Sequence, residues 1–363
     1  MFVGLETIAD QEIKSILDNP CTVVSKGRVE INEINLENIK NLKNLRSVEK
    51  IFIKLFQMNY ENENELHDTF KTLTDSIDKE KWIEFLNIWE NIVCKDTPRY
   101  RVTVKIKGKS KPTDKTIFSQ FIANELYKSF QKSQYQQIEP DVESYNMEFF
   151  VRMSMKRLWM GLNLTPITLW KERSYQTSLS FGKTSLKPTI CYAMLTLLNI
   201  NNGIILEPMV GSGMIIMELI DINNFKGICY FGDNADIAIL KTNHNLISLS
   251  KKNNENILCE LFRWDATNLP YQEGSIDGII TDLPFGKRIS NECQIHKLYP
   301  LLMNEFFRVL KKKGKLILLT SHTKLLNRIL NENRRWINQK QLRINHGGLE
   351  CTIFVLAKRY NKQ

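Results

Sequence analysis

The sequence predicts an α+β region up to about residue 170 and a doubly wound α/β domain after it. At 363 residues the chain is longer than a usual single domain, so we expect more than one compact unit. Before about residue 170, short alternating strands are mixed with amphipathic helices. From about residue 186, apolar strands alternate with helices, which is typical of a parallel sheet covered on both faces.

The first half of the chain has the pattern of short strands with helices packed on them. Val102, Val104 and Ile106 alternate with polar side chains, as in a half-exposed strand. We expect these strands to be antiparallel, and we expect the polar residues 60–80 to form a surface loop with a helical start. The expected elements are helix 6–18, strand 28–34, a helix running into a strand over 36–60, helix 81–93, strand 99–106, helix 116–130 and two strands within 147–165.

The second half repeats the order strand, turn, helix. Its last two strands are adjacent in sequence, so they predict an antiparallel hairpin at the edge of the sheet. The expected segments are helix 184–198, strand and helix 203–220, strand and helix 227–249, strand 257–263, strand 275–282, helix 298–310, strand 315–321, helix 323–331 and strands 336–347 and 349–359.

Composition favours a folded protein with a polyanionic partner. Hydrophobic residues make up 42% of the chain and charged residues 25%, which is ordinary for a globular protein. The net charge of +10 favours nucleic acid as a partner, although a general richness in Lys, Asn and Ile offers another explanation.

The cysteines and the N-terminal residues bear on the compartment. The seven cysteines are scattered and include no C-x-x-C pair, which argues against a disulfide framework and against a zinc site, so we expect no metal. They fit reduced thiols in a cytosolic or nuclear protein. Acidic residues interrupt the apolar N-terminal pattern, so we expect no signal peptide, and no apolar run reaches the ~18 residues of a membrane span.

Acidic residues and turn residues stand at the ends of consecutive predicted strands. Glu207 ends the first strand before the glycines of "GSG", Asp233 ends the second, and Asp265 follows the third beside Ala266. Open α/β sheets bind ligands outside the carboxyl ends of their strands. Any one acid could instead cap a helix, but the repetition favours a ligand with ribose hydroxyls and an adenine edge.

The turn after the strand that ends at Glu207 distinguishes a dinucleotide from S-adenosylmethionine as the ligand. A dinucleotide-binding G-x-G-x-x-G motif has a third glycine that packs the helix, and Ile216 stands in that place. S-adenosylmethionine has no phosphate that such a loop would hold. The sequence therefore favours S-adenosylmethionine over a dinucleotide.

The fourth strand ends in "TDLPF", which resembles the Asp/Asn-Pro-Pro-aromatic motif of methyltransferases that modify exocyclic amines. We expect Asp282 and the Leu283 carbonyl to accept the two N–H groups of such an amine. Pro284 would fix the turn and Phe285 would stack on the base. The alternative is that Phe285 belongs to the core and that the cations after it are simply solvated.

Several segments together resemble the THUMP-domain tRNA guanosine-N2 methyltransferases. The similarity covers nearly the whole chain and includes "RYRVTVKIKGK", "WMGLNLT", "SFGKTSLKPTICYAML", "EPMVGSGMI", "GDNAD", "WDATNLP", "GSIDGIITDLPFGKRIS" and "INHGGLECTIFVL". The resemblance implies a ferredoxin-like region over 1–95, a THUMP domain over 96–168 and a Rossmann-like class I methyltransferase over 169–363. It also implies a seven-stranded, mostly parallel sheet in the last of these.

The resemblance also implies a reaction and partners. Such enzymes transfer a methyl group from S-adenosylmethionine to N2 of an acceptor-stem guanosine of tRNA, at position 6 or 7, while the THUMP domain grips the acceptor end. Members of this branch work with a small zinc-binding activator subunit that covers a hydrophobic edge of the catalytic sheet. A cytoplasmic location, with a possible nuclear pool, follows from the same comparison.

The resemblance assigns cofactor-binding roles by position. The methionine moiety is assigned to Glu207, Pro208, Met209, Gly211 and Gly213, the ribose to Asp233 and Asn234, and the adenine to Asp265 and Ala266, with Asp282 nearby and Phe181 in a segment that closes over the cofactor. Glu207 stands where the family commonly has Asp, and Val210 where many relatives have Cys.

Clustered cations predict an RNA-binding surface, although each could instead lie on a solvated face. The candidate residues are Arg99, Arg101, Lys105, Lys107, Lys111, Lys156, Arg157, Arg173, Lys287 and Arg288. Other functions fit parts of the pattern. An adenine-N6 or glutamine-N5 methyltransferase, an enzyme acting on another structured RNA, and a noncatalytic RNA-binding subunit remain alternatives.

Overall fold

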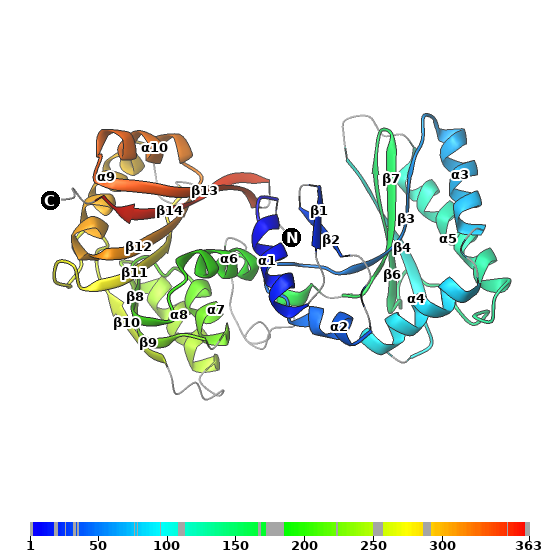
Figure 1. Ribbon diagram of the computed structural model, residues 1–363, viewed down its shortest axis with the longest axis horizontal. Coiled ribbons are helices and arrows are strands. Elements are labelled where there is room, and N and C mark those ends of the chain that lie inside the picture. Colours follow the sequence, from blue (N-terminus) through cyan, green and yellow to red (C-terminus); the bar gives the residue numbers. More distant parts are fainter. Residues whose placement is uncertain are drawn as a thin grey trace. The chain divides into compact units, whose positions relative to one another are not determined.

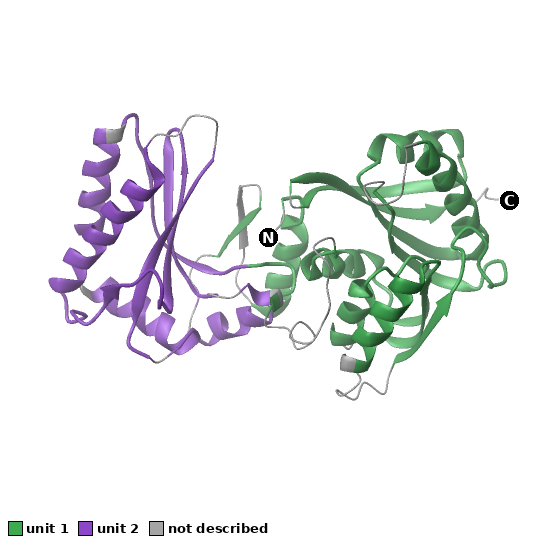
Figure 2. Ribbon diagram, turned by 180° about the vertical axis from the view of Figure 1, so that it is seen from behind, with its two compact units in different colours: residues 1–33, 45–49, 170–363 green, residues 34–44, 50–169 purple. Residues whose placement is uncertain are grey.

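The computed structural model forms two compact units, which Figure 2 colours separately. Unit 1 comprises residues 1–33, 45–49 and 170–363, and unit 2 comprises residues 34–44 and 50–169. The expected three-domain division, with boundaries after residues 95 and 168, stays a prediction. The structure describes residues 3–17, 21–25, 27–31, 34, 36–75, 77, 79–94, 96–107, 113–165, 168–171, 185–222, 224–249, 257–285, 292–346 and 348–359.

Unit 2 contains a five-stranded sheet in the order β3-β7-β6-β4-β5, with α3 and α5 on the same face (Figure 1). Its core lies between that face and the helices, and includes Trp82, Phe118, Phe130 and Phe149. The elements are α2 (Leu36–Asn41), η1 (Leu42–Asn44), β3 (Phe52–Asn59), α3 (Glu63–Asp75), α4 (Lys79–Ile92), β4 (Arg99–Ile106), α5 (Lys115–Gln131), β5 (Glu139–Pro140), β6 (Met147–Ser154) and β7 (Arg157–Asn163); η2 (Leu169–Lys171) follows.

Two expectations for unit 2 were wrong. Strand β4 pairs with β6 in parallel, because helix α5 crosses over between them; only the β3–β7 and β6–β7 pairs are antiparallel. The segment predicted as a loop forms helix α3, in which Leu66, Phe70 and Thr74 are buried at intervals of four residues. Burial of these three side chains on one face stabilises the helix, although most residues of the segment are polar.

Unit 1 contains a seven-stranded sheet in the order β10-β9-β8-β11-β12-β14-β13. The first four pairings along this order are parallel and the last two are antiparallel, which confirms the C-terminal hairpin at the edge. The elements of its C-terminal part are α6 (Pro188–Leu198), β8 (Asn202–Glu207), α7 (Met214–Ile222), β9 (Lys226–Asp233), α8 (Asp236–Leu249), β10 (Ile257–Arg263), β11 (Ile276–Asp282), α9 (Glu292–Val309), β12 (Leu310–Thr320), α10 (Thr323–Glu332), β13 (Trp336–His346) and β14 (Leu349–Lys358).

Both faces of this sheet are covered, as a doubly wound fold requires. Ile317 and Leu319 of β12 contribute to the core on the side of α6 and α7. Leu316 and Leu318 alternate with them and contribute to the core on the side of α9 and α10. Among the described residues, no helix is both long enough and apolar enough to cross a membrane.

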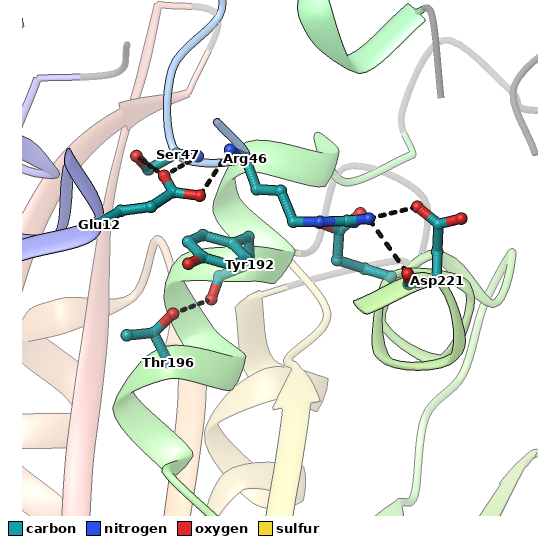
Figure 3. A network of polar contacts seen from close by, with 7 residues as sticks. Glu12, Arg46, Ser47, Tyr192, Thr196 and Asp221 are labelled. Atoms are coloured by element: carbon teal, nitrogen blue, oxygen red, sulfur yellow. Dashed lines mark hydrogen bonds and ion pairs between the residues drawn. The ribbon is translucent and has the colours of Figure 1, made fainter. Parts of the chain in front are cut away.

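A network of charged groups explains why the N-terminal segment belongs to unit 1 (Figure 3). This segment comprises α1 (Glu6–Ile16), β1 (Cys21–Ser25) and β2 (Arg28–Ile31). The Glu12 carboxylate on α1 accepts hydrogen bonds from the backbone N–H groups of Arg46 (2.7 Å) and Ser47 (2.9 Å). The Arg46 guanidinium in turn donates to Glu218 (2.9 Å) and Asp221 (2.6 Å) of α7. These charge-assisted bonds join α1 and residues 45–49 to the α/β domain.

Candidate active site

A cavity of about 590 Å³ lies at the carboxyl ends of β8, β9 and β11. Strands β8 and β11 are neighbours, although they are the first and fourth strands of the α/β domain in chain order, so the cavity lies at the point where the strand order reverses. The lining residues that the sequence predicted are Glu207, Pro208, Met209, Gly211, Asp233, Asn234, Asp265, Ala266, Asp282 and Pro284.

Two glycines form the turn between β8 and α7. Gly211 and Gly213 both have positive φ values, +58° and +78°, which favour glycine. A Cβ on Gly211 would meet no heavy atom within 4 Å, whereas a Cβ on Gly213 would lie 3.0 Å from Thr242 Cγ2 of α8. Gly211 therefore lines the cavity, while Gly213 allows α8 to approach the turn.

Asp233 holds this turn from the end of β9. Its Oδ2 accepts a hydrogen bond from the N–H of Gly211 (3.0 Å), and its Oδ1 accepts one from the N–H of Ala235 (3.0 Å). Each carboxylate oxygen can accept a further bond, so these contacts leave capacity for ribose hydroxyls. The Asp265 carboxylate is also held by neighbouring groups, because its Oδ1 accepts hydrogen bonds from the backbone N–H (2.8 Å) and the hydroxyl (2.7 Å) of Thr267.

Glu207 and Asp282 are the unusual acids of the cavity. Glu207 is only 2% exposed, and Glu207 Oε2 and Asp282 Oδ1 are buried without a hydrogen-bond partner among the described residues. Burial raises the pKa of Asp282 to about 8. Burial, together with the charges of Asp282 and Asp233, raises the pKa of Glu207 well above its usual value. Buried polar atoms that lack partners are costly, so the pair suits a ligand that brings N–H donors or positive charge.

The turn after β11 is tightly held. The Leu283 N–H donates to the Leu319 carbonyl (2.9 Å), and the Leu283 side chain is buried in the core on the α9 side. The Pro284 carbonyl accepts a bond from the hydroxyl of Tyr299 on α9 (3.2 Å). Phe285 is half-buried and packs against the core on the α6 side.

Twelve of the described lining residues were not predicted as site residues, and five of them lie away from the turns that follow the strands. Ser185 and Leu186 precede α6, Lys241 lies on α8, and Leu298 and Leu302 lie on α9. Ser185 and Leu186 lie within the quoted segment "SFGKTSLKPTICYAML", but the sequence predicted no site role for any of the five. Lys241, Leu298 and Leu302 come from helices, whose rotation toward the strand ends depends on packing.

The predicted RNA-binding cations of unit 2 fall into two groups. Arg99 and Arg101 form ion pairs with Asp141 (3.3 Å) and Glu148 (3.1 Å), and Arg101 also lies over the Tyr145 ring at 3.9 Å. The other group comprises Lys105, Lys107, Lys156 and Arg157, which are all exposed, as Arg99 is too. The remaining predicted site residues, Phe181, Lys111, Arg173, Lys287 and Arg288, lie outside the described residues.

The sheet order and the cavity at its switch point define unit 1 as carrying a methyltransferase-type α/β domain. In agreement, residues 176–352 match the family described as "UPF0020: RMKL-like, methyltransferase domain". The protein SMU.472, whose crystal structure was solved in complex with SAH, has the same fold, with a TM-score of 0.73 at 17% identity over 99% of this chain and 97% of that chain.

The names of curated relatives specify a reaction more closely than the family model does, and they confirm the resemblance that the motifs predicted. The chain is 30% identical to human tRNA (guanine(6)-N(2))-methyltransferase THUMP3 over 251 residues, which are 66% of this chain and 48% of the human protein. It is 30% identical to mouse U6 snRNA (guanine-N(2))-methyltransferase THUMPD2 over 183 residues, which are 50% of this chain and 32% of the mouse protein. The chain thus spans half or less of the length of these two relatives.

Proposed function

We propose that this protein is an S-adenosylmethionine-dependent RNA methyltransferase that modifies N2 of guanosine in tRNA. The observation that carries the proposal is the pair of buried, unpartnered carboxylate oxygens of Glu207 and Asp282, which lie at neighbouring strand ends in one cavity. Relatives named as guanine-N2 methyltransferases support the choice of reaction.

The cavity residues fit S-adenosylmethionine. Its sulfonium and ammonium groups carry the positive charge and N–H donors that two buried acids require. Glu207, Met209 and Gly211 would hold the methionine moiety, Asp233 and Asn234 the ribose, and Asp265 with Ala266 the adenine. When bound, the cofactor supplies an electrophilic methyl group next to Asp282.

The turn after β11 would bind the guanine. Its exocyclic amine is a poor nucleophile because the nitrogen lone pair is delocalised into the ring. The positive charge of bound cofactor would favour ionised Asp282, and this carboxylate and the Leu283 carbonyl would then accept hydrogen bonds from the two N–H groups and concentrate charge on N2. Bound S-adenosylmethionine would supply the methyl group, with the new bond to N2 made as the carbon–sulfur bond breaks, and the product amine would lose its proton to water. The protein contributes mainly alignment.

Unit 2 would bind the RNA. We assign it the THUMP domain, residues 96–168, which grips the acceptor end of tRNA, and the part of the ferredoxin-like region 1–95 that lies outside unit 1, with position 6 as the target by analogy with the named relative. Four of its exposed predicted cations, Lys105, Lys107, Lys156 and Arg157, would contact phosphates. The target base is paired in a stem and must be flipped out, at a cost of a few kcal/mol.

A protein partner would cover the edge strand β10. Strand β10 ends the sheet order, and its Leu258 and Phe262 side chains are 54% and 39% exposed. An exposed apolar edge strand is suited to pairing with a strand of another chain. We assign this edge to the small zinc-binding activator subunit that the resemblance implies, and we place the complex in the cytoplasm.

The test is methyl transfer from labelled S-adenosylmethionine to tRNA, followed by mass analysis of the nucleosides. We expect N2-methylguanosine from the wild-type protein with its activator. We expect Asp282→Ala to lower the transfer rate at least a hundredfold while tRNA affinity stays within a few-fold, because the carboxylate contacts the amine and not the phosphates. Unchanged turnover in this variant would contradict the role of Asp282.

A second candidate is the same reaction on a different structured RNA. The similarity to U6 snRNA methyltransferase THUMPD2 favours it, although that match covers only 50% of this chain. Incubation with a U6 snRNA transcript beside tRNA distinguishes the two substrates. A noncatalytic RNA-binding subunit is the third possibility, and absence of S-adenosylmethionine binding in calorimetry would favour it.

A further inference from the structure

The turn after β11 is linked to a buried hydroxyl pair outside the cavity lining. Tyr299 of α9 and Thr320 at the end of β12 are both fully buried, and their hydroxyl oxygens lie 2.8 Å apart. The Tyr299 hydroxyl is also 3.2 Å from the Pro284 carbonyl, and the Thr320 hydroxyl is 2.9 Å from the N–H of His322. Three elements thus meet behind the predicted base-binding turn.

The chemistry of these groups fixes the direction of the bonds. A carbonyl can only accept, so the Tyr299 hydroxyl donates its single hydrogen to Pro284. The Thr320 hydroxyl must then donate to Tyr299 and accept from the His322 N–H. The chain of bonds runs from His322 through Thr320 and Tyr299 to Pro284, and each hydroxyl acts once as donor and once as acceptor.

A weaker contact fixes the next residue of the turn. The His322 Nε2 lies 3.4 Å from the Phe285 carbonyl, and because the carbonyl accepts, Nε2 carries the hydrogen. The rings of Tyr299 and His322 pack edge to face with centroids 6.1 Å apart. The carbonyls of Pro284 and Phe285 therefore both point toward α9 and the β12–α10 junction.

We propose that Tyr299, through the chain that Thr320 and His322 complete, is a positioning residue for methyl transfer. Its hydroxyl orients the peptide plane between Pro284 and Phe285, and the His322 side chain orients the Phe285 carbonyl, so that the Leu283 carbonyl is the one left for the substrate amine. Consistent with this, the structure records no hydrogen bond to the Leu283 carbonyl from the described residues. The inference rests on the proposed function, because it gives the turn the task of binding the guanine.

The position of Tyr299 indicates that it positions the turn and does not itself touch the reacting atoms. Tyr299 does not line the cavity, whereas its neighbour in sequence, Leu298, does. Burial raises the pKa of the Tyr299 phenol, so the hydroxyl stays a neutral donor. Loss of the hydroxyl should therefore loosen the turn without removing a group that touches the reacting atoms.

The test compares Tyr299→Phe with Tyr271→Phe, a control that removes a phenol hydroxyl outside the cavity lining. We expect Tyr299→Phe to lower the single-turnover rate at saturating tRNA at least tenfold, with cofactor affinity within twofold of wild type. Amide hydrogen exchange at Leu283 in the cofactor-free protein should accelerate at least tenfold. Thr320→Val should act in the same direction, and Thr320→Ser should restore both values, because serine keeps the hydroxyl.

Two outcomes would overturn the inference. One is an unchanged rate and unchanged exchange in Tyr299→Phe, and the other is a lower rate with unchanged exchange, since the hydroxyl would then act other than by holding the turn. The exchange measurement needs no substrate. If wild-type protein methylates no RNA, the proposed function fails, and the exchange comparison still decides whether Tyr299 holds the turn.

Discussion

At the scale of single residues, the acids of the cavity divide into two kinds. Asp233 and Asp265 accept hydrogen bonds from neighbouring N–H groups, which is the ordinary capping behaviour of an acid after a strand. Glu207 and Asp282 each keep one buried oxygen without a partner among the described residues. The sequence placed all four at strand ends, but it could not separate the two kinds, because burial depends on which side chains pack above them.

The buried state of Asp282 gives a prediction about stability and pH. Its folded pKa, about 8, lies above the unfolded value of about 3.9, so the folded state without cofactor binds the proton more tightly. This contribution to stability is therefore fully present below about pH 4 and is lost as the pH rises through the folded value, about 8. We expect Asp282→Asn to remove this loss and to be more stable than wild type by a few kcal/mol at pH 8, since one pKa unit corresponds to about 1.4 kcal/mol.

Chemical denaturation of both proteins between pH 4 and pH 9 measures this difference. The control is Asp265→Asn, because the Asp265 carboxylate already accepts hydrogen bonds from Thr267. Parallel stability curves for wild type and Asp282→Asn would show that Asp282 does not titrate in a buried site.

At the scale of elements, the turn between β8 and α7 gives two glycines different tasks. Both would suffer the strain of positive φ on substitution, roughly 1–2 kcal/mol. Only at Gly213 would a Cβ also press on Thr242 Cγ2, at 3.0 Å. We expect Gly213→Ala to cost about 2–3 kcal/mol of folding stability, whereas Gly211→Ala should cost about 1 kcal/mol and mainly change cofactor affinity.

Urea denaturation and calorimetric titration with S-adenosylmethionine separate these effects. The matched control is Gly213→Ala combined with Thr242→Ser, which removes the Cγ2 methyl but keeps the hydroxyl that donates to the Gly211 carbonyl (3.3 Å). Equal stability losses at the two glycines, or no recovery in the double variant, would contradict the contact with α8.

The elements themselves were predictable to different degrees. Strands β8, β9 and β11 were clear because apolar runs end in acids, and that arrangement also predicted ten of the described residues that line the cavity. Helix α3 was missed because its buried positions are few, and the parallel β4–β6 pair was missed because strand direction depends on the crossover helix. The helix residues Lys241 and Leu302 reach the cavity through packing, for which the sequence pattern gave no signal.

At the scale of the whole molecule, contacts between distant segments decide what belongs together. Arg46 and Asp221 are 175 positions apart, yet their ion pair helps to join residues 45–49 to the α/β domain (Figure 3). No local pattern predicts such a pair. The apolar character of β10 is similar, because its residues read as an ordinary buried strand until the sheet order places β10 at the edge.

The edge position of β10 leads to a prediction about assembly. Leu258 is 54% exposed on this strand, and Leu301 on α9, away from the edge, is exposed to the same extent. If the proposed zinc-binding activator pairs with β10, Leu258→Asp should abolish its co-purification after co-expression and make the isolated chain less prone to aggregate, because a charge at an edge opposes strand pairing. Leu301→Asp should leave the complex intact, as measured by light scattering and gel filtration. Loss of the complex in both variants, or in neither, would place the partner elsewhere on the protein.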